Sequence, residues 1–113
     1  MSSTITVVYN SNNILESITV CGHAGIKKSG EGYEVCIAIS TLTQAMYISL
    51  LNIVGKKYLL LKKDDAFINL KIGNFDELDY NKQNEYKIVS DGYLIAIKSL
   101  IKEYPDFIKY KEE

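Results

Sequence analysis

The chain has 113 residues, of which 47% are hydrophobic and 24% charged, and its formal net charge is -1. This size and balance fit one globular domain with one core and exclude a disordered chain. All 13 basic residues are lysines. Lysine lacks the planar fork with which arginine reads guanine or clamps phosphate, so the composition argues against specific nucleic-acid recognition.

The N-terminus and the apolar segments indicate the cellular localisation of the protein. Residues 1–6 lack the basic and apolar regions of a signal peptide. Polar residues interrupt the longest apolar stretch, 37–54, which falls short of the roughly 18 consecutive apolar residues that span a bilayer. We therefore expect a cytoplasmic protein that does not enter a membrane and whose two cysteines are reduced thiols.

The first part of the chain has the composition of β-strands. Residues 5–9 are rich in β-branched and aromatic side chains, and a second strand is expected over 14–22. If this strand stays regular, Cys21 and His23 point to the same face of the sheet. Gly22 between them indicates a bend or a close approach of the backbone.

Two long helices are predicted, over 34–54 and 81–103. Gly55 is placed to end the first helix, and Pro105 stops the second. The first helix is apolar on two sides, which predicts burial between layers or against a partner subunit. One stripe consists of Val35, Ile39, Leu42, Met46, Ser49 and Ile53, and the other of Ile37, Ile48 and Leu51.

The segment between the helices predicts an antiparallel hairpin. Its arms are 58–61 and 66–72, joined by a turn at 62–65. A short edge strand is expected at 107–111. The element order is then ββαββαβ, which predicts a single α+β domain over residues 1–113, with a mostly antiparallel sheet packed against two helices.

The residues that can carry chemistry are concentrated in one region. His23, the only histidine, is two positions after Cys21, and Cys36 is the only other cysteine. The intervening segment 25–32 is rich in glycine and charge, which predicts a loop between the end of a strand and the start of a helix. Such a loop lets an imidazole meet a thiol, the minimum requirement for cysteine-based nucleophilic catalysis.

Cys36 is the better candidate for the nucleophile. It lies in the first turn of a predicted helix, where unpaired backbone amides and the macrodipole favour a thiolate. The same amides can bind the oxyanion of a tetrahedral intermediate. His23 can act as the general base and then protonate a leaving amine. Ser40, one turn after Cys36, shares its helix face and can orient the thiol, the imidazole or the substrate.

Other interpretations of these residues stay open. Cysteine is among the most frequently buried residue types, so either thiol can be purely structural. Cys21, His23 and Cys36 are also three potential zinc ligands, with water, Glu31 or Glu34 as a fourth. A redox pair of the two cysteines is weaker, because their spacing is not that of a Cys-x-x-Cys motif.

Two short motifs resemble those of the bacterial ribosomal-processing cysteine protease family, Prp. They are Gly22-His23-Ala24 and, after a glycine-containing loop, Val35-Cys36-Ile37-Ala38-Ile39-Ser40. The length, the element order and Tyr104-Pro105 also match, so the resemblance covers nearly the whole chain. Carried over by motif, Cys36 is the nucleophile and His23 the base, while Gly22 and Ser40 belong to the same motifs.

The resemblance implies a function that needs no cofactor or metal. It implies a homodimeric Cys–His dyad protease whose partner is the N-terminal peptide of a ribosomal protein precursor. The family removes this extension from the twenty-seventh protein of the large ribosomal subunit and cuts after an aromatic residue. Neither nucleic acid nor membrane is implied as a partner.

The chain departs from the family pattern in and after the loop. His23 and Cys36 are 13 positions apart, which is one residue longer than usual. Tyr33 replaces an aspartate, and Ile37 stands where alanine is common. Whether the neighbouring Glu34 supplies the missing carboxylate stays open. These departures motivate a second hypothesis, a divergent member that binds a ribosomal or assembly protein without cutting it.

Overall fold

The elements follow the predicted order ββαββαβ in the computed structural model, which describes residues 3–22, 33–64 and 66–113. A five-stranded sheet has the strand order β3-β4-β2-β1-β5. The α+β class predicted from the sequence is therefore confirmed. The strands are β1 (Ser3–Tyr9), β2 (Leu15–Cys21), β3 (Leu59–Asp64), β4 (Phe67–Ile72) and β5 (Ile108–Glu112).

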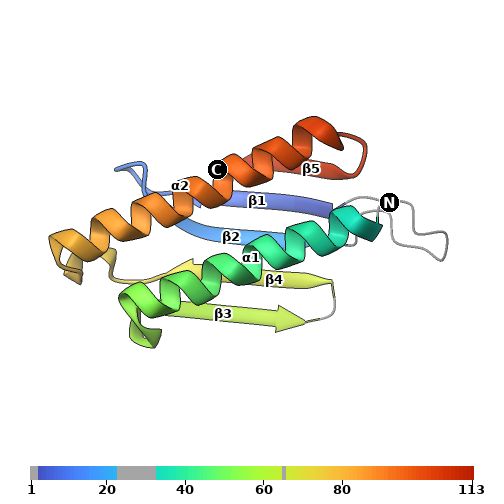
Figure 1. The fold of residues 1–113 in the computed structure, drawn as a ribbon. Coiled ribbons are helices and arrows are strands. Elements are labelled where there is room, and N and C mark those ends of the chain that lie inside the picture. Colours follow the sequence, from blue (N-terminus) through green and yellow to red (C-terminus); the bar gives the residue numbers. More distant parts are fainter. Residues whose placement is uncertain (1–2, 23–32, 65) are drawn as a thin grey trace.

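Two helices, α1 (Tyr33–Val54) and α2 (Tyr80–Glu103), lie side by side across one face of the sheet (Figure 1). A short 3-10 helix at 56–58 follows α1, and another at 75–77 precedes α2. The core lies between this helix layer and the sheet. The largest fully buried hydrophobic side chains come from both layers and include Ile5, Ile18, Ile39, Leu50 and Ile97.

The sheet is mostly antiparallel, as predicted. The pairs β1–β2, β2–β4 and β3–β4 are antiparallel, whereas β1 and β5 pair in parallel. The parallel pair arises because α2 carries the chain back across the sheet before β5 begins, as parallel strands require. The strand order leaves β3 and β5 at the two edges of the sheet.

The buried stripe of α1 differs from the predicted stripe in its second half. After Met46, burial continues at Leu50 and Val54, whereas Ser49 is exposed and Ile53 only half-buried. The prediction followed a strict helical period. The stripe instead drifts around the helix, because α1 crosses a sheet that twists beneath it.

Thr43 is a buried polar residue that the sequence did not single out. Its hydroxyl donates to the carbonyl oxygen of Ile39 at 2.8 Å and lies 2.8 Å from the hydroxyl of Tyr93. Since the one proton of Thr43 is used toward Ile39, Tyr93 is the donor in the second bond. Burial raises the pKa of Tyr93 to about 12. The pair joins α1 to α2 inside the core.

The β3–β4 hairpin has a shorter turn than predicted. Residues 62–64 continue β3 and pair with 67–69 of β4, so a turn spanning 62–65 is wrong. Ala66, which precedes β4, has a φ of 57°, in the left-handed region. Two-residue hairpin connections need such backbone angles. The paired strands therefore extend further than the charged sequence indicated.

The α1 helix is more apolar than expected from the sequence. Glu34–Val54, with 21 residues, is long and apolar enough to cross a membrane, and 28% of its most apolar stretch is buried. The sequence predicted no such segment, but the scattered Ser, Thr and Gln residues lower the mean hydropathy of α1 too little to exclude it. A core helix of a globular domain can be equally long and apolar, and α1 packs its buried stripe on the sheet.

Candidate active site

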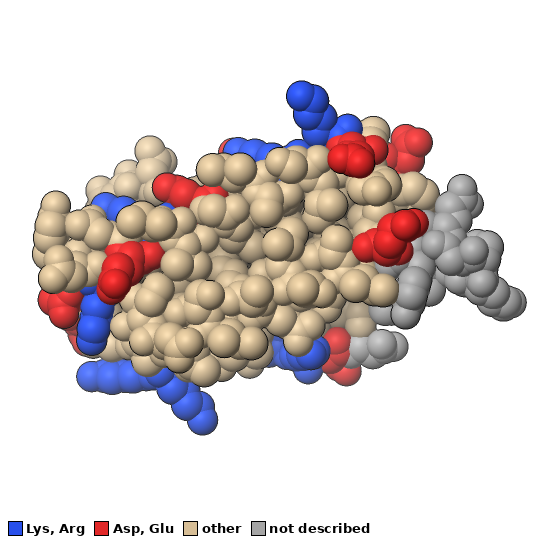
Figure 2. All heavy atoms as spheres, in the orientation of Figure 1, with Lys and Arg blue, Asp and Glu red and all other residues tan. Residues whose placement is uncertain are grey.

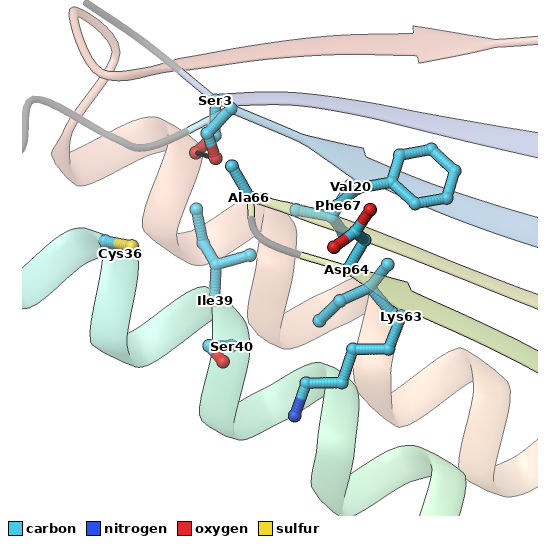
Figure 3. Close-up of a pocket in the computed structure, with 11 residues that line it drawn as sticks. Ser3, Val20, Cys36, Ile39, Ser40, Lys63, Asp64, Ala66 and Phe67 are labelled. Carbon is cyan, nitrogen blue, oxygen red and sulfur yellow. Dashed lines mark hydrogen bonds between the residues drawn. The ribbon is translucent and has the colours of Figure 1, made fainter.

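A cavity of about 550 Å³ opens between the N-terminal half of α1 and one end of the sheet (Figure 3). Its walls come from β1, the end of β2, α1 and the β3–β4 hairpin. The lining residues are Ser3, Val20, Gly22, Cys36, Ile39, Ser40, Lys63, Asp64, Ala66, Phe67 and Ile68. Three predicted site residues, Gly22, Cys36 and Ser40, are thus brought together at one cavity.

Cys36 lies in the first turn of α1, as predicted, because the helix begins at Tyr33. Its side chain is partly exposed and contributes to the cavity wall (Figure 3). Backbone amides in a first helical turn lack partners four residues earlier, and the helix dipole favours an anion there. These amides are therefore available to a negatively charged group at the cavity wall.

Gly22 directly follows β2 and forms hydrogen bonds to residues in or next to the neighbouring strands. Its φ is 87°, a left-handed conformation that favours glycine. Its amide donates to the carbonyl oxygen of Ala66 at 2.8 Å, and its carbonyl accepts from Ser3 Oγ at 3.2 Å. Regular strand geometry therefore stops at Gly22, whereas the predicted shared face of Cys21 and His23 stays untested. His23 itself, with the segment 23–32, lies outside the described residues.

Ser40 is one helical turn beyond Cys36 and is held by its neighbours. Its Oγ accepts a hydrogen bond of 2.9 Å from Gln44 Nε2. The other end of that amide, Gln44 Oε1, accepts from Lys63 Nζ at 3.3 Å. Because Ser40 Oγ is an acceptor here, its own proton can be donated in another direction.

Two residues considered in the sequence analysis lie outside the cavity wall. Glu34 is exposed at the start of α1 and does not line the cavity. Cys21 is exposed as well. Val20 lines the cavity, so strand alternation places Cys21 on the opposite face of the sheet.

The position of Cys21 bears on the metal and redox interpretations. Both cysteines are described, and neither forms a disulfide within the described chain. Because Cys21 and Cys36 lie on different sides of the sheet, they are not placed to share one ion or to form a redox pair. Among residues 3–22, 33–64 and 66–113, no group of three or more His, Cys, Asp and Glu side chains is placed to hold a metal ion.

The sequence analysis missed the walls supplied by Ser3 and by the hairpin tip. Ser3 is almost fully buried at the start of β1. Lys63 extends from β3 toward α1 near Ser40 (Figure 3). The Lys-Lys-Asp-Asp run at 62–65 marks the tip of a hairpin in the sequence. The position of Lys63 and Asp64 at the same cavity as Cys36, however, depends on the pairing of β4 with β2.

Comparison with known proteins gives a consistent result. The family model described as cysteine protease Prp matches residues 3–109. A crystal structure of the ribosomal processing protease Prp from S. aureus with a substrate peptide has a TM-score of 0.80 and 13% identity, covering 98% of this chain and 99% of that one. A search of curated proteins finds no match.

Two further solved structures share the fold. The S. aureus protease with a covalently linked product peptide has a TM-score of 0.79 and 14% identity, over 98% of this chain and 99% of that one. The protein SMU.848 from Streptococcus mutans has a TM-score of 0.76 and 22% identity, covering 98% of this chain and 93% of that one. At these identities the likeness shows the fold alone.

Proposed function

Because the chain belongs to the cysteine protease Prp family, we propose that it is a cytoplasmic endopeptidase acting on a ribosomal protein. Its substrate is then the N-terminal extension of the twenty-seventh protein of the large subunit. The observation that carries the proposal is the thiol of Cys36, in the first turn of α1, at a cavity that Gly22 and Ser40 also line. The S. aureus protease of the same fold was crystallised with a substrate peptide, which supports a peptide substrate here.

In the proposed mechanism, the Cys36 thiolate attacks the carbonyl carbon of the scissile peptide bond. The new carbon–sulfur bond forms a tetrahedral intermediate, whose oxyanion the amides of the first turn of α1 can stabilise. The intermediate collapses as the carbon–nitrogen bond breaks, and the imidazolium of His23 gives its proton to the leaving amine. Water, deprotonated by His23, then hydrolyses the thioester and regenerates the thiol. The assignment of His23 rests on the Gly22-His23-Ala24 motif.

Ser40 has a role in the proposed mechanism, whereas Glu34 has none. The Ser40 hydroxyl accepts from Gln44 and lines the cavity, and in this proposal it donates to the thiolate or to a substrate carbonyl. Glu34 is exposed outside the cavity wall. The proposal therefore gives Glu34 no contact with the substrate.

The test is cleavage of a peptide that carries the extended N-terminus of the ribosomal protein, followed by mass spectrometry. We expect Cys36→Ala and His23→Ala each to reduce turnover by at least about a thousandfold, as loss of a covalent nucleophile or its base does. Cys21→Ser is the matched control and should keep most of the activity, because Cys21 lies outside the cavity. Equal turnover by Cys36→Ala and the parent would overturn the assignment. Binding of the peptide without turnover by the parent would favour the non-catalytic hypothesis.

We further propose that the protein is a homodimer that pairs through the outer surface of its helix layer. Figure 2 shows a broad uncharged area over α1 and α2. Ile88 and Ile95 on α2 are 71% and 68% exposed. Small side chains, including Gly92 and Ala96, line a shallow cleft between the helices. An extended apolar surface of this kind marks an interaction site.

Sedimentation equilibrium tests the dimer. We expect the parent to sediment as a dimer and Ile95→Lys to sediment as a monomer, because a charge in an apolar interface is costly to desolvate. Leu60→Lys is the control, since Leu60 is also exposed, at 52%, but lies on β3. A monomeric parent would contradict the proposed dimer.

A further inference from the structure

A second cavity adjoins the one that contains Cys36. It measures about 230 Å³ and lies between the middle of α1 and the edge strand β3. The lining residues are Thr43, Gln44, Tyr47, Ile48, Leu61, Lys63 and Ile68. Lys63 and Ile68 also line the first cavity. The two cavities are therefore neighbours along α1, and together they are called the groove below.

A polar bridge crosses the groove where the two cavities meet. Lys63 Nζ on β3 donates to Gln44 Oε1 on α1 at 3.3 Å, and Gln44 Nε2 donates to Ser40 Oγ at 2.9 Å. Beyond this bridge, the walls are mainly the side chains of Tyr47, Ile48 and Leu61. The groove thus changes from a thiol and a hydroxyl, through a polar bridge, to an apolar compartment.

We propose that this second cavity is a specificity subsite for one apolar side chain of the substrate peptide, about four residues from the scissile bond. The inference rests on the proposed peptidase function. The middle of the α1 segment 43–48 is about 14 Å along the helix from Cys36, at about 1.5 Å per residue. An extended peptide advances about 3.3 Å per residue, so about four residues cover that length. Tyr47, Ile48 and Leu61 are then specificity-determining residues.

An extended peptide is the occupant that the surroundings favour. The second cavity shares Lys63 and Ile68 with the proposed catalytic cavity, so a chain held at Cys36 lies next to it. One wall is β3, an edge strand, whose outer side presents backbone groups that can pair with an extended chain. The compartment beyond the bridge is lined by uncharged side chains, which suits an apolar rather than a charged residue of the substrate.

The experiment measures binding, so that it does not depend on turnover. The Cys36→Ala chain is titrated with fluorescent peptides in which each position, up to six residues on either side of the cleavage site, is in turn Leu or Ser. We expect one position, about four residues away on one side only, at which Ser weakens binding by about tenfold or more, as loss of a buried apolar side chain does. The readout is fluorescence anisotropy.

The wall of the cavity is tested by Ile48→Ser and Leu61→Ser in the same background. Both changes should reduce the Leu-over-Ser preference at that position to about twofold or less. Leu60→Ser is the matched control on the same strand, because Leu60 points to the opposite face of the sheet and should keep the preference. If Leu61→Ser destabilises the fold, Ile48→Ser decides, since Ile48 is 57% exposed. Sedimentation of the Ile48 variant checks that its oligomeric state is unchanged.

The outcomes separate the subsite from the proposed function. Cleavage that does not depend on Cys36 would overturn the peptidase mechanism, whereas the binding scan would still report on the subsite. A flat scan, or a preference that survives both Ile48→Ser and Leu61→Ser, would overturn the subsite even if cleavage depends on Cys36. A preference lost in both variants and kept in Leu60→Ser supports it.

Discussion

The two ends of α1 meet the sheet in different ways. Near its N-terminus, the helix and the sheet enclose a cavity of about 550 Å³, whereas farther along only about 10 Å³ remains between them. Small residues among those that line the large cavity contribute to the difference. Ser3, Gly22, Cys36, Ser40 and Ala66 face the large cavity. The tight end is filled by larger residues such as Leu15, Met46, Leu50, Leu70 and Tyr86.

The tight end also contains a buried polar group, the Tyr86 hydroxyl, that has a hydrogen-bond partner. The Tyr86 hydroxyl donates to the carbonyl oxygen of Leu15, and the Tyr86 ring packs edge-on against Phe75 with centroids 5.3 Å apart. Burial raises the pKa of Tyr86 above its ordinary value. The sequence thus stabilises the fold at one end of α1 and leaves space for a ligand at the other. Mutations at the two ends should accordingly affect stability and activity separately.

The largest effect on stability is expected at the tight end. Leu50 is 1% exposed, and Leu50→Ala should lower the free energy of unfolding by about 2–5 kcal/mol. Urea denaturation measures the loss. At temperatures where the variant is folded, its cleavage rate should stay within about twofold of the parent, because Leu50 is remote from Cys36 along α1 by about 21 Å. A large loss of activity in the folded variant would contradict the separation of the two ends.

A smaller loss of stability, accompanied by a loss of activity, is expected for Gly22→Ala. Alanine at a φ of 87° is strained, and such strain costs about 1–3 kcal/mol. Relaxation of that strain would disturb the hydrogen bonds to Ser3 and Ala66 at the cavity wall. Urea denaturation and peptide cleavage measure both effects. Gly73→Ala is the matched control, since a Cβ there meets nothing within 4 Å. Equal behaviour of the two variants would show that the conformation of Gly22 is not needed.

The same contrast explains which features were predictable from the sequence. Helix periodicity, Gly55 and Pro105 placed both helices within a residue or so of their observed ends, and Cys36 therefore fell in the first turn of α1. These are local properties. The wall formed by Ser3 and the hairpin tip depends on long-range pairing, because β4 lies next to β2 in the sheet. The local sequence Lys-Lys-Asp-Asp does not show which strand β4 will pair with.

Alternation along a strand was a weaker guide than helix periodicity at the site. Alternation does describe β4, where Ile68 and Leu70 are both buried. It gives no guide beyond Cys21, because Gly22 adopts a positive φ that regular strand geometry does not include. The glycine itself was the available signal for this unusual backbone conformation. The buried Thr43 had no such signal, since its partner Tyr93 is 50 residues away in the sequence.

The smallest effect on the free energy of unfolding at neutral pH is expected for Tyr93→Phe. This effect should change with pH in the alkaline range. Loss of the hydrogen bond to Thr43 costs about 1 kcal/mol. In the parent, burial raises the pKa of Tyr93 from 10.0 to about 12. Between these values the unfolded chain loses the phenol proton while the folded chain keeps it. This group's contribution to stability is therefore complete below pH 10 and falls by about 1.4 kcal/mol per pH unit above it.

Urea denaturation from pH 9 to pH 12 (about three units, spanning the window set by this pKa shift) measures the difference between Tyr93→Phe and the parent. The variant should be less stable near pH 9, and the gap should close or reverse as the pH rises, because phenylalanine cannot ionise. Tyr80→Phe is the control, since Tyr80 is 76% exposed and its hydroxyl is in contact with water in both states. If the gap between Tyr93→Phe and the parent stayed constant with pH, the buried phenol would not be a source of alkaline instability, and the polar link between α1 and α2 would stabilise the fold through its hydrogen bond alone.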